Sequence, residues 1–147
     1  MTSRIWHSAA GLGEFACRKT LEFTGGEGAG QAGSTCALFT VTGAVATLVI
    51  AACTKTLVGA TATVEVGTNA NPNAIIATTG APTITTGTIW VDATPVVIEC
   101  WTNAWGCMIG DGADIELLPG VANVTDGTLV FTCFWTPLTD GATVVAA

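Results

Sequence analysis

The chain has 147 residues, of which 50% are hydrophobic and 10% are charged, with a formal net charge of −7 and a pI near 4.2. This length suits a single domain with a real hydrophobic core. Four Lys and Arg residues cannot form the basic stripe that neutralises phosphates, so the composition argues against nucleic acid and anionic membrane surfaces as partners. The low charge, with 18 Gly and no Tyr, indicates a surface largely covered by other protein.

The first 34 residues differ from the rest, because they hold three of the four basic residues and end in a glycine-rich run, Gly25–Ser34. So many glycines cannot hold a helix. Large apolar side chains nevertheless give this segment candidate interface anchors: Ile5, Trp6, Phe15, Leu21 and Phe23. We therefore predict an extended N-terminal arm over residues 1–34 that docks on a neighbouring subunit. A disordered terminus with incidental aromatic residues is the alternative.

From Cys36 onward, short runs rich in Val, Ile, Thr and aromatic residues alternate with turn residues. The predicted strands are Leu38–Thr42, Val45–Ala52, Thr61–Val66, Ala74–Ala77, Thr88–Val91, Pro95–Trp101, Ile115–Leu118 and Thr128–Pro137. The last run is apolar on much of both faces, which is typical of a central strand. Asp126-Gly127 is the best hairpin signal. The sequence predicts an all-β domain over residues 35–147. Within this class we expect a β-sandwich, preferably of the jelly-roll type.

The longest apolar run, Ala44–Cys53, is about half of the roughly 20 residues needed to cross a bilayer. The residues after Met1 contain no apolar block of the kind found in secretion signals. We therefore expect no transmembrane helix and no secretion signal, and synthesis in a cytoplasm.

Six cysteines without a Cys-x-x-Cys pair, and a single His, argue against a zinc site. They fit either small buried hydrophobes or disulfides formed late, within or between chains, once an assembly meets an oxidising exterior. The candidate disulfide cysteines are Cys17, Cys36, Cys53, Cys100, Cys107 and Cys133. Cys17 and Cys36 flank a mobile-looking segment and are the best candidates for crosslinks.

Catalysis by a nucleophile and base has little support, because the only histidine, His7, lies in the arm. A dyad of Cys17 with His7 is the weak enzymatic alternative. Asp111, Asp114 and Glu116 could form a calcium loop or an acid pair, but a solvated hairpin turn entering a strand, with Asp114 and Glu116 pointing outward, is the simpler interpretation. The glycine-rich stretches lack the Lys of a phosphate loop. We predict no catalytic residue, no cofactor and no metal.

Trp101 and Trp105 lie in the most aromatic loop, between Cys100 and Cys107. We expect core packing or a subunit contact there, since Trp is enriched at buried interfaces. Stacking on sugar rings is the alternative and would make this loop a carbohydrate-binding site.

Four blocks, over about residues 36–147, resemble small structural proteins of tailed bacteriophage virions: Leu38–Gly43, Ala62–Thr68, Gly87–Pro95 and Phe131–Ala147. In such phages, β-rich proteins of this size serve as head decoration, or cement, proteins on the outer capsid lattice, often as trimers. The resemblance implies a virion location, no enzyme activity, and the major capsid protein and copies of itself as partners. The six cysteines depart from the pattern of such proteins.

These observations lead us to expect a non-enzymatic decoration protein on the capsid surface of a virion, which clamps adjacent capsomers through exchanged arms and through disulfides. An apolar arm would be repeated around a lattice and so would gain avidity. A carbohydrate- or receptor-binding virion module, or a tail or neck component, is the alternative.

Overall fold

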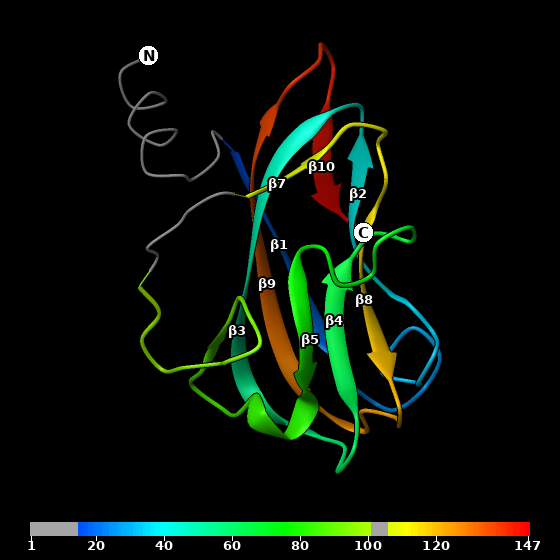
Figure 1. Ribbon diagram of the computed structural model, residues 1–147, viewed down its shortest axis with the longest axis vertical. Helices are drawn as coiled ribbons and strands as arrows, with labels where there is room; N and C mark the ends of the chain where they lie inside the picture. The colour runs from blue at the N-terminus through cyan, green and yellow to red at the C-terminus, as the bar shows by residue number, and fades with distance from the viewer. Residues whose placement is uncertain (1–14, 101–105) are drawn as a thin grey trace.

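A computed structural model describes residues 15–100 and 106–147, and in this part of the chain the strands form two antiparallel sheets (Figure 1). The first sheet has the order β1-β9-β3-β6, with β7 also paired to β3, and the second has the order β10-β2-β8-β4-β5. The elements are β1 (Phe15–Glu22), β2 (Cys36–Thr42), β3 (Val45–Val58), β4 (Thr63–Gly67), β5 (Ile76–Gly80), the short helix η1 (Ala81–Thr83), β6 (Ile89–Trp90), β7 (Cys107–Ile109), β8 (Ile115–Gly120), β9 (Asp126–Pro137) and β10 (Thr143–Ala146). The all-β prediction is confirmed for these residues.

Alternation along the strands builds the core, because successive side chains point to opposite faces of a sheet. In β9, every second residue from Leu129 to Cys133 is buried, and β8 likewise buries Ile115 and Leu117. These inward residues of both sheets belong to one hydrophobic cluster. The prediction that the Thr128–Pro137 run is a central strand is confirmed, since β9 lies between β1 and β3.

Side-chain hydrogen bonds link the two sheets at both of their edges. On one side, the Trp90 indole in β6 donates to the Thr79 hydroxyl in β5 at 2.8 Å. On the other side, the Lys19 ammonium in β1 donates to the main-chain oxygen of Ala147, which follows β10. The edges of the two sheets are therefore tied to each other by polar contacts as well as by the shared core.

The predicted arm is wrong in its second half, because residues 15–34 belong to the fold. Residues 15–22 form β1 and pair with β9 in continuous antiparallel register from Phe15–Trp135 to Glu22–Thr128. The glycine-rich connection is held as well: Gly33 donates to the Pro119 carbonyl at 2.8 Å. Residues 1–14 of the predicted arm lie outside the described residues.

The prediction of a strand over Pro95–Trp101 is wrong over its described part, residues 95–100. Val96 forms an isolated bridge with Ile89, and Val97 and Ile98 are 71% and 80% exposed. β-propensity alone does not make a strand without a partner along its length. Strands β7 and β10 were not predicted from the sequence.

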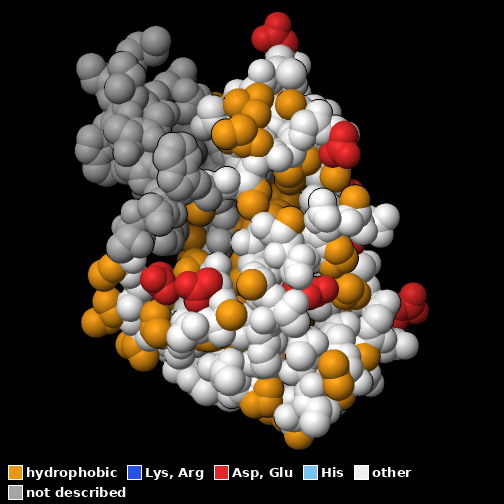
Figure 2. Space-filling view, viewed as in Figure 1, with side chains coloured by type: hydrophobic (Ala, Val, Ile, Leu, Met, Phe, Trp, Pro, Cys, Tyr) orange, Lys and Arg blue, Asp and Glu red, His pale blue; other side chains and the backbone are white. Residues whose placement is uncertain are grey.

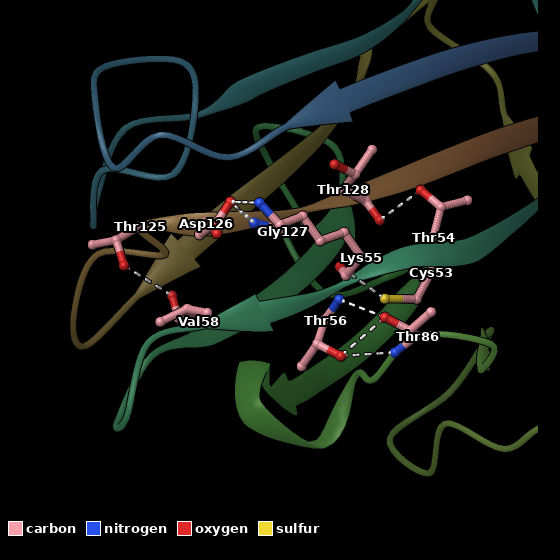
Figure 3. Close-up of polar contacts among 10 residues, drawn as sticks. All are labelled: Cys53, Thr54, Lys55, Thr56, Val58, Thr86, Thr125, Asp126, Gly127 and Thr128. Atoms are coloured by element: carbon pink, nitrogen blue, oxygen red, sulfur yellow. Dashed lines mark hydrogen bonds and ion pairs between the residues drawn. The ribbon is translucent and has the colours of Figure 1, made fainter.

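The Asp126-Gly127 pair opens β9 instead of forming the tip of a hairpin (Figure 3). It lies opposite a register irregularity in β3 between Lys55 and Val58. Asp126 accepts hydrogen bonds from the Lys55 ammonium at 2.7 Å and from the Gly127 amide at 2.8 Å. Gly127 has a φ of 120°, so this glycine serves a bulge and not a tight turn.

Candidate functional site

The candidate site is the outer face of the first sheet, formed by the outward side chains of β3 and β9. These residues are Ala46, Leu48, Ile50, Ala52, Val130, Thr132 and Phe134, all half-buried. Strand pairing places them in rows: Leu48 lies opposite Phe134, and Ala52 lies opposite Val130. None carries a charge, so the centre of this outer face is apolar over four successive outward positions of β3.

The apolar character of β3 on both faces explains the long run that the sequence shows. Its inward positions, including Val45, Val49 and Ala51, are buried in the core, while its outward positions are equally apolar. A sheet that faces water on one side normally alternates apolar and polar residues. The exception here marks the outer face as a surface suited to contact with other protein.

Polar and exposed residues border the outer face. Along β1, next to β9, the outward side chains include Arg18 and Glu22, both exposed. On the other side of β3, Met108 of β7 pairs with Ala46 and is 74% exposed. The outer face therefore has charged side chains along its β1 side, as in the polar rim of many protein interfaces, and an exposed apolar side chain on its β7 side.

Elsewhere the surface carries few charges. On the view in Figure 2, most of the surface is neutral, hydrophobic side chains gather in small groups, and acidic side chains appear at a few places. Apart from the neighbours Val97 and Ile98, the exposed large hydrophobic residues include Val58 at the end of β3, Val121 just after β8 and Val145 in β10. Scattered single residues of this kind need no functional explanation, unlike the rows of the outer face.

Of the predicted interface anchors, Phe15 is exposed, whereas Leu21 and Phe23 are buried. Leu21 and Phe23 are 7% and 3% exposed and belong to the chain's own core, so they do not serve as contacts to a neighbour. Phe15 is 43% exposed and packs on Trp135 with ring centroids 4.7 Å apart. Ile5, Trp6, Trp101 and Trp105 lie outside the described residues.

A hollow of about 430 Å³ opens beside Phe15 and Trp135. Its lining continues along the segment from Pro137 to Thr143, with Leu138 51% exposed and Asp140 at its border. Phe15 and Trp135 form one side of this mostly apolar hollow, hereafter the Phe15 groove. A second open hollow, about 360 Å³, lies between the Thr68–Ile75 segment and β7.

All six cysteines are free thiols in this structure. Cys17 and Cys36, the best crosslink candidates from the sequence, lie in different sheets: Cys17 is half-buried in β1 and Cys36 is fully buried in β2. Register brings Cys17 opposite Cys133 of β9 instead, and the Cys17 sulfur lies 4.0 Å from the Cys133 carbonyl oxygen. Cys53 and Cys107 direct their sulfurs to backbone carbonyls, and Cys100 is exposed.

Burial governs the acidity of the thiols. It raises the pKa of Cys17, Cys36, Cys53 and Cys107 above the ordinary value. The pKa of Cys133 rises furthest, first through burial and then through the neighbouring Cys17. A raised pKa leaves less thiolate at neutral pH, so none of these five resembles an activated nucleophile.

The acidic cluster forms a turn before a strand, as predicted, but the turn is not that of a hairpin, because β7 and β8 lie in different sheets. Asp111 accepts a hydrogen bond from the Ala113 amide at 3.1 Å, and Asp114 accepts one from the Val41 amide at 2.9 Å, just before β8 begins at Ile115. Within residues 15–100 and 106–147, no three His, Cys, Asp or Glu side chains gather where a metal could bind. The same residues contain no helix of the length and apolarity needed to span a membrane.

Comparison with known proteins adds no relative. No family model, no curated protein and no solved structure matches this chain.

Proposed function

We propose that this protein is a non-enzymatic structural component of a phage virion, most specifically a head decoration protein that binds the outer capsid lattice. Its partners are the major capsid protein and copies of itself. The proposal combines the resemblance of four sequence blocks to small virion proteins with the outer face of β3 and β9. The apolar outer face is the observation on which the proposal chiefly rests.

The outer face supplies a contact without chemistry. Burying apolar area contributes roughly 25 cal/mol per Å², so rows such as Leu48–Phe134 can drive association when a partner covers them. We assign the major capsid protein to this face in preference to a second copy. Two copies stacked there would each bring a net charge of −7, which opposes close approach.

Contacts between copies belong to the Phe15 groove in this proposal. The residues that precede Phe15 include Ile5 and Trp6, whose apolar side chains suit the groove of a neighbouring copy. Residues 1–14 carry one Arg and one Glu and are near neutral, so a negatively charged body repels this segment less than it repels a second body. Exchange around a trimer would repeat each contact and add avidity.

We also propose that the two sheets form a jelly-roll type of β-sandwich. Its support is the strand order, in which β1, β2, β3 and β4 pass alternately from one sheet to the other. The later strands continue this crossing, since β8 and β9 again lie in different sheets. Such crossing connections are the mark of the double Greek key of jelly rolls.

The proposal is tested on purified virions of a phage whose genome encodes this chain. Quantitative mass spectrometry measures its amount relative to the major capsid protein. A near-stoichiometric amount supports a decoration protein, provided that the protein can be released from virions while their tails stay attached. Trace amounts that fractionate with isolated tails would assign it to the tail or neck instead, and absence from virions would overturn the proposal.

A further inference from the structure

We propose that Cys17 and Cys133 form a reversible intrachain disulfide that fastens the edge strand β1 to β9. This modification site is independent of the proposed function, because it rests on the register of two strands within one chain. Its oxidant is a small disulfide such as oxidised glutathione.

Strand register makes the juxtaposition. Cys17 and Cys133 are direct partners in an unbroken eight-pair ladder, and both lie on the inward side, as do the partners Leu21 and Leu129. Opposite residues in antiparallel strands have Cα atoms about 4.5 to 5.5 Å apart, within the span that a disulfide bridges. The two residues are 116 positions apart in the sequence, so folding alone brings them together.

Hydrogen bonding indicates why the bond would be reversible. Phe23 continues this ladder and donates its amide to the Gly127 carbonyl at 2.9 Å, as in a hydrogen-bonded pair. Hydrogen-bonded and non-hydrogen-bonded pairs alternate along an antiparallel ladder. Every second pair before Phe23–Gly127 is therefore hydrogen-bonded, and the Cys17–Cys133 pair is one of these. Hydrogen-bonded pairs keep their Cβ atoms farther apart than other pairs, whereas a disulfide needs them near 3.8 Å. The bond therefore forms with strain, and strained disulfides are the readily reduced ones.

Accessibility sets the order of events. Cys17 is half-buried on the edge strand, whereas Cys133 is fully buried. The Cys17 thiolate attacks oxidised glutathione, forming a mixed disulfide and releasing one glutathione thiolate. The Cys133 sulfur lies beside the Cys17 sulfur, so the small fraction of Cys133 that is thiolate suffices to attack the mixed disulfide and to release the second glutathione. The two protons lost by the cysteines end on two glutathione molecules, and the two electrons reduce the glutathione disulfide.

The consequence concerns β1, an edge strand that pairs with β9 alone in its sheet. Edge strands open more readily than central ones. A link at Cys17, near the start of β1, holds this end of the strand on β9, and it closes a long loop in the unfolded chain. Oxidation would thus fix the segment that leads back to residues 1–14.

The experiment uses the full chain with the background substitutions Cys100→Ser and Cys107→Ser. Trypsin then yields a fragment ending at Arg18 with Cys17 as its one cysteine, and a fragment beginning at Thr56 with Cys133 as its one cysteine. After incubation with oxidised glutathione and digestion without reductant, we expect these two fragments joined, with the mass of two hydrogen atoms missing. We also expect the Tm to rise by several degrees and to return after dithiothreitol.

Cys17→Ser in the same background is the control, and because Cys17 is half-buried this change keeps the fold. It should abolish both the joined fragments and the rise in Tm. The proposal is overturned if the wild-type pair yields only a persistent glutathione adduct on Cys17. It is equally overturned if the crosslink instead joins the Thr20–Lys55 fragment, which holds Cys36 and Cys53.

Discussion

The indole nitrogen of Trp90 donates a 2.8 Å hydrogen bond to the hydroxyl of Thr79, and this bond joins β6 of one sheet to β5 of the other. Both side chains are buried, and the Thr79 hydroxyl donates in turn to the Ala77 carbonyl at 2.8 Å. Trp90 also packs edge-on against Phe131 at 6.3 Å, so its position matters to the core as well as to the edge.

Replacing Thr79 with Val should cost about 1–3 kcal/mol of unfolding free energy, because the buried indole N–H loses its acceptor. Urea denaturation followed by Trp fluorescence measures the change. Thr79→Ser keeps the hydroxyl and should retain most of the stability. Equal stabilities for Thr79→Val and the wild type would contradict the role of this bond.

Gly127→Ala should destabilise the fold by about 3 kcal/mol or more, combining backbone strain with a clash. Gly127 has a φ of 120°, and a Cβ there would lie 2.5 Å from Leu57 Cδ2 and 2.8 Å from Leu57 Cα. Gly87 is a matched control, since its φ is 89° but a Cβ there meets nothing within 4 Å. Thermal and urea unfolding should show a larger loss of stability for Gly127→Ala than for Gly87→Ala, because only the former adds a clash to the backbone strain. Equal losses of stability would refute the clash.

The carboxyl of Asp126 should titrate at an unusually low pH. The hydrogen bond from Lys55, followed by that from the Gly127 amide, lowers its pKa below the ordinary value. A depressed pKa in the folded state stabilises the fold above the unfolded pKa of about 3.9, and this contribution is lost as the pH falls through the folded pKa. The effect on stability is small, because Lys55 and Asp126 are solvent-exposed.

Carbon NMR of the Asp126 carboxyl measures that pKa directly. Lys55→Gln removes the main cause and should move the pKa back toward the ordinary value, while the Gly127 amide keeps part of the shift. An unchanged pKa in Lys55→Gln would show that the ion pair does not govern the titration.

The sequence predicted the strands whose signals are local. The alternation and β-branched content of Thr63–Gly67 and Asp126–Pro137 mark β4 and β9 without knowledge of their partners. Strand β1 was missed as a strand because it carries charged residues, among them Arg18 and Glu22, and a glycine-rich loop follows, a combination that is typical of an independent arm. Its place in the sheet depends on pairing with β9, more than one hundred residues away.

The candidate surface could be predicted from the sequence, whereas the Cys17–Cys133 pair could not. Apolar residues at both odd and even positions of the Ala44–Cys53 run signal a strand covered on two sides. Cys17 lies opposite Cys133 because of the register between β1 and β9. The sequence of β1 does not determine this register, because its outward side is polar and its inward side is only partly apolar.

The central claim is that the outer face binds the capsid, and occupancy of Leu48→Lys on purified capsids tests it most directly. Val145→Lys, on β10 of the other sheet, is the control, since Val145 is 53% exposed. Because Leu48 is half-buried, Leu48→Lys should cost about 1–2 kcal/mol of unfolding free energy, and urea denaturation must first show that the variant is folded. It should nevertheless weaken capsid binding at least about tenfold, equivalent to about 1.4 kcal/mol, while Val145→Lys binds as the wild type does. Wild-type occupancy by folded Leu48→Lys would contradict the account.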